Sequence, residues 1–110
     1  MKKGEKILEI INSGDKLTVL LSGELDHHSF KKIRPTIDAQ IEEHTPKLII
    51  LDFGGVNFMD SSGIGLILGR KRIAESFGGR VMLQNITGYV EKLINLAGLS
   101  TMIIKKKIHN

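Results

Sequence analysis

The run KLIILDF at residues 47–53 is apolar without the alternation of a half-exposed strand. It follows Pro46 and has the length of a strand rather than of a helix. Continuous apolarity is typical of a strand covered on both faces, as in parallel sheets whose crossover helices pack on them. Because RVMLQN at residues 80–85 has the same character, the sequence favours an α/β protein.

Helical patterns separate these two runs. Within residues 26–44, Ile33, Ile37 and Ile41 recur every four positions and form one apolar stripe. Pro35 lies inside this pattern and is expected to kink the helix or to make it restart. Two further helices are predicted over residues 61–77 and 86–99.

The remaining segments complete the order ββαβαβαβ. Residues 7–25 hold two strands around the turn NSGD, residues 54–58 form a loop, and residues 101–106 form a last short strand or extended segment. This order predicts an α/β fold with a mixed, mostly parallel sheet and helices packed on it. We expect a single domain over residues 1–110, with a frayed basic tail at 105–110.

Composition narrows the function classes. The chain has no cysteine, which excludes disulfides and thiolate metal sites. It shows no signal peptide and no apolar run near the roughly 20 residues that span a bilayer, so we expect a cytoplasmic protein without a membrane partner. The net charge of +4 comes from scattered cations, Arg70 among them, which we assign to solvated helix faces. With only 5% aromatic residues, direct binding of nucleic acid is not expected.

The segment FMDSSGIG at residues 58–65 joins a strand to a helix. Asp60, Ser61 and Ser62 are all residue types that cap helix N-termini, and one of them is expected to do so. A nucleophilic serine needs a neighbouring base, and the hydrolase elbow reads G-x-S-x-G. Met59 and Asp60 stand where that elbow needs its first glycine, so no catalytic residue is predicted and the protein is not expected to be an enzyme.

The glycines of this segment resemble the G-x-G-x-x-G motif of dinucleotide-binding proteins. Gly63, Gly65 and Gly69 have the wrong last spacing, and the next strand ends in Gln84 and Asn85 rather than in an acid. No cofactor is therefore predicted. Because Gly65 and Gly69 lie four residues apart, we expect them to let the helix approach a neighbour closely.

A metal site at Asp26, His27 and His28 is not expected either. Adjacent residues of one element point in different directions, so the three cannot ligate one ion together. Asp26 is instead predicted to cap the first helix, with both histidines partly exposed.

A surface serine at a helix N-terminus can carry a phosphate. The backbone N–H groups and the helix dipole favour an anion there. Phosphorylation adds about −1.5 to −2 charges, which disfavours any partner that binds the neutral hydroxyl. The serine needs no base of its own, because a kinase supplies one.

These residues resemble the anti-sigma-factor antagonists, which are built on the STAS domain, and in particular the sporulation type. The matching segments are GELDHH at 23–28, FMDSSGIGLILGR at 58–70, GG at 78–79 and GL at 98–99. The order of elements matches over residues 7–104. The resemblance implies a sheet of four to five strands with helices on one side.

The resemblance also implies partner switching. The unphosphorylated protein binds an anti-sigma factor that is itself an ATP-dependent serine kinase, which frees the sigma factor. Phosphorylation separates the pair, and a serine phosphatase restores binding. Carried onto this chain, Ser61 is the phosphoacceptor. The implied partner-binding residues are Glu24, Asp26, Asp60, Ser62 and Gly63.

Three features depart from the family pattern. Longer members have an acidic segment and a further helix where this chain reads KKKIHN, Pro35 lies in the first helix, and Thr87-Gly88 replaces Ser-Pro, with Thr87 expected to cap. The alternative function is a STAS scaffold module of a stress-signalling assembly. A small enzyme or nucleotide-binding protein is a third hypothesis, although the chain lacks a Walker-type loop.

Overall fold

The computed structural model describes residues 7–105, so the tail predicted to fray, residues 105–110, lies outside the described residues except for Lys105. The elements are β1 (Leu8–Ser13), β2 (Lys16–Leu25), α1 (His27–His44), β3 (Leu48–Met59), α2 (Ser62–Ser76), β4 (Arg80–Gln84), α3 (Gly88–Leu96) and a 3₁₀ helix (Ser100–Met102). This arrangement confirms the predicted fold class. Within residues 7–105, no helix is both long enough and apolar enough to cross a membrane.

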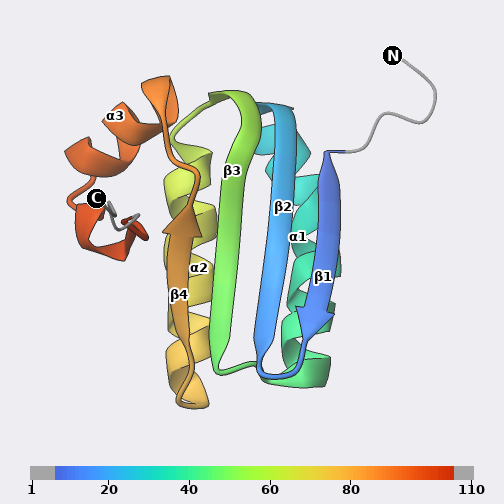
Figure 1. Ribbon diagram of the computed structural model, residues 1–110. Coiled ribbons are helices and arrows are strands. Elements are labelled where there is room, and N and C mark those ends of the chain that lie inside the picture. Colours follow the sequence, from blue (N-terminus) through green and yellow to red (C-terminus); the bar gives the residue numbers. More distant parts are fainter. Residues whose placement is uncertain (1–6, 106–110) are drawn as a thin grey trace, which may run out of the picture.

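The four strands form one sheet in the order β1-β2-β3-β4 (Figure 1). β1 and β2 are antiparallel and joined at Gly14, whose φ of 62° suits a tight hairpin turn. The β2–β3 and β3–β4 pairs are parallel. The carboxyl ends of these three strands therefore meet at one end of the sheet, where α/β proteins place their sites.

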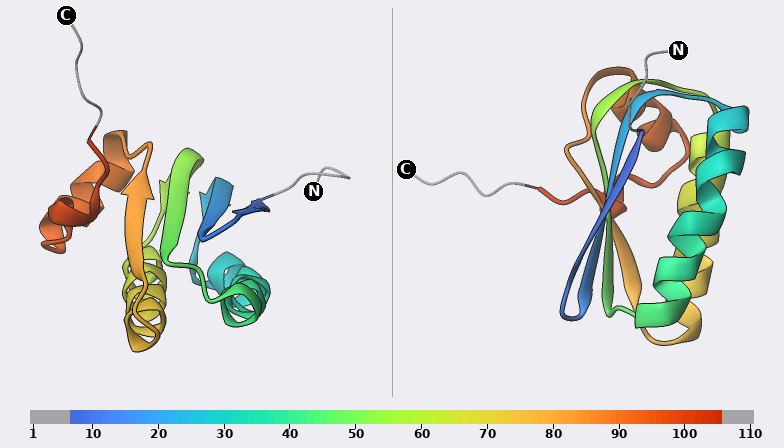
Figure 2. Two further views of the ribbon diagram at one scale, coloured as in Figure 1. Left: turned by 60° about the horizontal axis from the view of Figure 1, so that its bottom comes forward. Right: turned by 90° about the vertical axis from the view of Figure 1, so that its right-hand side faces the viewer.

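Helices α1 and α2 pack side by side on one face of the sheet, and α3 lies beyond the β4 edge (Figure 2). Ile49, Leu51 and Phe53 of β3 face the helices and are fully or almost fully buried. Both faces of this strand are buried, as predicted, although α1 and α2 cover only one of them (Figure 2). Ile50 and Asp52 on the opposite face are nevertheless only 5% and 6% exposed. They lie on the central part of the sheet, with paired residues of β2 and β4 on either side.

Two segments differ from the predicted elements. Residues 54–58 are not a loop, because β3 keeps pairing with β2 as far as Met59, with register shifts on the way. The segment after α3 makes the 3₁₀ helix and then a single parallel bridge between Leu83 and Ile103. Met102 turns into the core just before this bridge, which limits the extended segment to one pairing.

Helix α1 runs through Pro35 as one element, so the predicted restart does not occur. Phe30 and Ile33 before the proline are buried in the same core as Ile37 and Ile41 after it, which holds both halves of the helix against the sheet. Thr87 occupies the N-cap position of α3, but its side chain makes no capping hydrogen bond, contrary to expectation.

The packing role predicted for Gly65 and Gly69 is wrong. A Cβ atom added at either position meets nothing within 4 Å. The closely packed glycine of α2 is Gly63, where an added Cβ would lie 2.2 Å from the Sδ atom of Met59. The first turn of α2 therefore rests on the end of β3.

These contacts predict opposite effects for the same substitution. Gly65→Ala and Gly69→Ala are each expected to raise the free energy of unfolding by about 0.5–1 kcal/mol, because alanine favours the helix and loses less entropy on folding. Gly63→Ala is expected to lower it by about 1–3 kcal/mol through overpacking against Met59. Urea unfolding of the three variants measures both effects. A destabilised Gly65→Ala protein would contradict the open space around Gly65.

Candidate functional site

The turn from β3 into α2 lies beside the turn from β2 into α1. Leu25 pairs with Met59 at the ends of the two strands, and Asp60 N donates to Leu25 O at 3.3 Å. The β2–β3 register shifts twice just before this point, and Gly23 there has a φ of 89°. Such bulges redirect the ends of strands next to sites. Both predicted site segments therefore meet at one end of the sheet.

The carboxylate of Asp60 connects the starts of α1 and α2. Its Oδ2 accepts a hydrogen bond from His27 N at 3.1 Å, and its Oδ1 accepts one from Ser62 N at 2.9 Å. The Ser62 hydroxyl also donates to Oδ1. These bonds lower the pKa of Asp60, the Ser62 hydroxyl most of all, although desolvation opposes them. Of the three predicted capping residues, Asp60 supplies the capping oxygen.

Ser61 occupies the N-cap position of α2 but does not cap with its side chain. Ser61 is exposed, and its hydroxyl has no hydrogen-bond partner within residues 7–105. The backbone at Ser61 is already helical, with φ −64° and ψ −14°. An unbonded, exposed hydroxyl at this position is accessible to another protein.

Two further predicted residues lie at the same end. Asp26 caps α1 as predicted, because its Oδ1 accepts from Ser29 N at 2.9 Å and from the Ser29 hydroxyl at 3.1 Å. Those bonds lower its pKa. Glu24 is exposed and pairs with Phe58 across the β2–β3 ladder. Glu24, Asp26 and Asp60 therefore lie at the same end of the sheet as Ser61.

The fifth predicted partner-binding residue, Gly63, is buried against Met59 and does not belong to the exposed surface. Its effect on a partner would therefore be indirect, through the position of the α2 start. His27 and His28 are exposed, as predicted. Within the described part of the chain, no group of three or more His, Cys, Asp or Glu side chains is arranged to hold a metal ion.

An exposed aromatic pair lies at the same end of the sheet, and one of its members, Phe58, pairs with Glu24 across the β2–β3 ladder. The rings of Phe58 and Tyr89 are stacked, with centroids 5.7 Å apart and planes 10° apart, although both residues are about half exposed. Sequence reasoning missed this pair because Tyr89 lies at the start of α3, far from Phe58 along the chain. Phe58 inside the FMDSSG segment was the only local signal.

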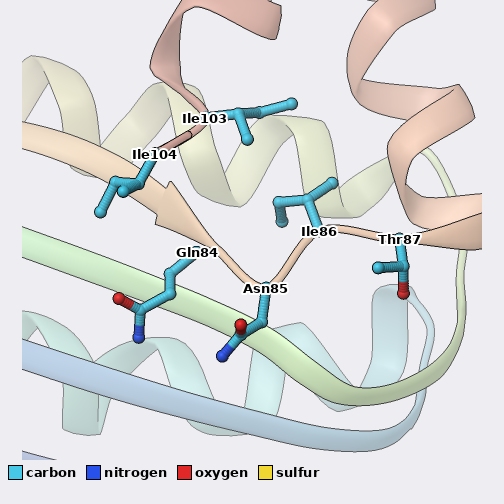
Figure 3. A pocket seen from close by; sticks show the side chains of 6 residues that line it. All are labelled: Gln84, Asn85, Ile86, Thr87, Ile103 and Ile104. Atoms are coloured by element: carbon cyan, nitrogen blue, oxygen red, sulfur yellow. The ribbon is translucent and has the colours of Figure 1, made fainter. Parts of the chain in front are cut away.

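A second polar cluster lies on the sheet face away from α1 and α2. The Oδ1 atom of Asp52 accepts from Gly54 N at 2.8 Å, and its Oδ2 accepts from Gln84 Nε2 at 2.8 Å and Asn85 Nδ2 at 2.9 Å. Figure 3 shows Gln84 and Asn85 side by side at the end of β4, in the lining of an open pocket of about 450 Å³. That pocket shares no residue with the surface around Ser61, so we do not assign the site to it. The sequence signal for this cluster was Asp52, a charged residue inside the apolar run KLIILDF.

Known proteins share the sequence pattern and the fold of this chain. The STAS domain family model matches residues 8–110. An anti-sigma F factor antagonist from Lysinibacillus sphaericus is 42% identical over 85 residues, which cover 77% of this chain and 73% of that protein. The structure of the anti-sigma factor antagonist SpoIIAA in its unphosphorylated form superposes with a TM-score of 0.82 at 35% identity and covers 91% of this chain and 88% of that one.

The phosphorylated form of SpoIIAA, a Bacillus cell fate determinant, superposes with a TM-score of 0.74 at 34% identity and covers 91% of each chain. The family match extends over nearly the whole sequence, and both SpoIIAA structures superpose on most of the chain. The chain therefore belongs to the STAS domain family and shares the fold of the anti-sigma factor antagonist SpoIIAA.

Proposed function

We propose that this protein is a cytoplasmic anti-sigma factor antagonist that is switched off by phosphorylation of Ser61. In its unphosphorylated form it binds an anti-sigma factor with serine kinase activity, and the sigma factor is released. A serine phosphatase restores the binding form. The protein itself is a binding protein rather than an enzyme, and it needs no cofactor, nucleic acid or membrane.

The exposed and unbonded hydroxyl of Ser61 carries this proposal. It stands at the N-terminus of α2, where backbone N–H groups and the helix dipole tolerate a phosphate. The related SpoIIAA protein has been observed in unphosphorylated and phosphorylated forms. A phosphate on Ser61 would not need to refold the domain, because it would change the charge of a surface that is already exposed.

The binding surface proposed around Ser61 combines charge and apolar area. Glu24, Asp26 and Asp60 supply negative charge, and the stacked rings of Phe58 and Tyr89 supply exposed apolar surface. Aromatic residues of this kind are enriched at protein interfaces. A partner with basic side chains fits the unmodified surface, whereas the added phosphate disturbs contacts made directly over the serine.

Phosphopeptide mass spectrometry tests the proposal. The protein isolated from its native cells is expected to carry phosphate on Ser61, and the Ser61→Ala variant is expected to lose that phosphate but still bind the anti-sigma factor in a pull-down. Growing, starved and sporulating cells should all be sampled. An unmodified Ser61 under all three conditions would contradict the proposal and favour a constitutive scaffold.

A further inference from the structure

The two serines at the start of α2 have different surroundings. The Ser61 side chain is exposed and makes no capping hydrogen bond. Ser62 is only partly exposed, and its hydroxyl donates to Oδ1 of Asp60. The same oxygen accepts from Ser62 N at 2.9 Å. One carboxylate therefore holds Ser62 at two atoms and leaves Ser61 free.

Asp60 is itself held in place. Its second oxygen accepts from His27 N at 3.1 Å, at the start of α1. Turning the carboxylate away from Ser62 would therefore also break a contact to another helix. Since hydrogen bonds to an ionised acceptor are the stronger class, the arrangement resists opening.

We propose that Asp60 selects the phosphoacceptor: it holds the Ser62 hydroxyl back from the kinase, so that the phosphate goes to Ser61. This inference rests on the proposed function and adds the choice between two adjacent serines. Asp60 is a positioning residue in this role, because it acts through the Ser62 side chain.

The chemistry of transfer explains the selection. The serine Oγ forms a bond to the terminal phosphorus of a nucleoside triphosphate, and the bond from that phosphorus to the bridging oxygen breaks. The nucleoside diphosphate leaves, and the hydroxyl proton passes to a base of the kinase. Ser61 can turn its hydroxyl to such a base freely. Ser62 must first give up its bond to Asp60 before its hydroxyl can attack.

The share of phosphate on each serine is the direct test. Wild type and Asp60→Ala are incubated with the anti-sigma factor kinase of the same organism and ATP, and phosphopeptides are quantified by mass spectrometry. The wild type is expected to carry nearly all its phosphate on Ser61. In Asp60→Ala the Ser62 share is expected to rise at least about tenfold, which is the scale of losing one charge-assisted hydrogen bond.

The share is a ratio within one sample, so weaker binding of the variant to the kinase does not alter its meaning. Asp60→Asn keeps an acceptor oxygen without the charge, and its Ser62 share is expected to lie between the other two. An unchanged Ser62 share in Asp60→Ala would overturn the proposal. So would a wild type phosphorylated mainly on Ser62, because Asp60 would then be activating that serine as a base.

A second measurement needs no kinase. NMR follows the Asp60 carboxyl carbon against pH in the wild type, in Ser62→Ala and in the matched control Ser61→Ala. The Ser62 hydroxyl is the largest cause of the lowered pKa of Asp60, so Ser62→Ala is expected to raise that pKa and Ser61→Ala to leave it unchanged.

The two measurements also separate the inference from the proposed function. A wild type phosphorylated on neither serine contradicts the proposed function itself. A wild type phosphorylated on Ser61, together with the same Asp60 pKa in all three proteins, contradicts only the selection by Asp60.

Discussion

Ser61→Asp is expected to weaken binding to the anti-sigma factor by at least about a hundredfold, or about 2.7 kcal/mol. The substitution places a negative charge at the exposed centre of the proposed surface, beside Asp60. A charge without a matching partner at an interface costs several kcal/mol. Isothermal titration calorimetry with the purified anti-sigma factor and ADP measures the loss.

The variant is expected to stay folded, which keeps the result interpretable. Ser61 is at the N-cap of α2, a position that favours aspartate and is stabilised by negative charge. Ser61→Asn is the control for shape, because it has almost the same size without the charge. Thr36→Asp, on the exposed surface of α1, is the control for net charge. Binding of Ser61→Asp within about threefold of wild type would contradict the switching mechanism.

The fold was predictable because periodicity and turn residues agree along most of the chain. The apolar run before Asp52 gave the central strand, and the stripe through Ile33, Ile37 and Ile41 gave α1. The predictions failed where tertiary contacts decide the outcome. Residues 54–58 pair with β2 through two register shifts instead of forming the predicted loop, and the buried core face of α1 holds the helix together across Pro35, so that it does not restart there.

The candidate site was predictable in part. The motif around Ser61 and the capping role of Asp26 both follow from local sequence, and Asp26 does cap α1. The hydrogen bond from His27 N to Asp60 does not follow from local sequence, because His27 belongs to another element. Arg70 was assigned to a solvated face, yet it is 5% exposed and its Nε lies 3.0 Å from Asp38 Oδ1 on α1. Pairs from distant elements leave no periodic signal.

Asp52→Ala is expected to lower the free energy of unfolding by about 3 kcal/mol. The carboxylate is 6% exposed and accepts three hydrogen bonds, from Gly54, Gln84 and Asn85. Each bond to a charged group contributes about 1.5–3 kcal/mol where it is buried. The expected loss is smaller than the sum of three such bonds, because water can reach Gln84 and Asn85 and accept their hydrogen bonds in place of Asp52. Urea unfolding measures the change.

Glu42→Ala is the matched control, because this exposed acid of α1 has no hydrogen bond or ion pair within residues 7–105. Its removal is expected to change the free energy of unfolding by less than about 0.5 kcal/mol.

Asn85→Gly removes one donor to Asp52 without backbone strain, since Asn85 has a φ of 56° that glycine adopts readily. Combined with Asp52→Ala in a double-mutant cycle, it isolates that one bond. If Asp52→Ala were as stable as Glu42→Ala, the cluster would not anchor the end of β4.

The same cluster connects stability to the proposed binding surface. Asn85 begins the segment that leads from β4 to Tyr89, so the bond to Asp52 fixes the point from which that ring reaches Phe58. Tyr89 is the only tyrosine and the chain has no tryptophan, so intrinsic fluorescence reports on this ring. We expect Asp52→Ala to change the Tyr89 emission under conditions where the protein is still folded. Emission identical to wild type would mean that the aromatic pair is held by α3 alone.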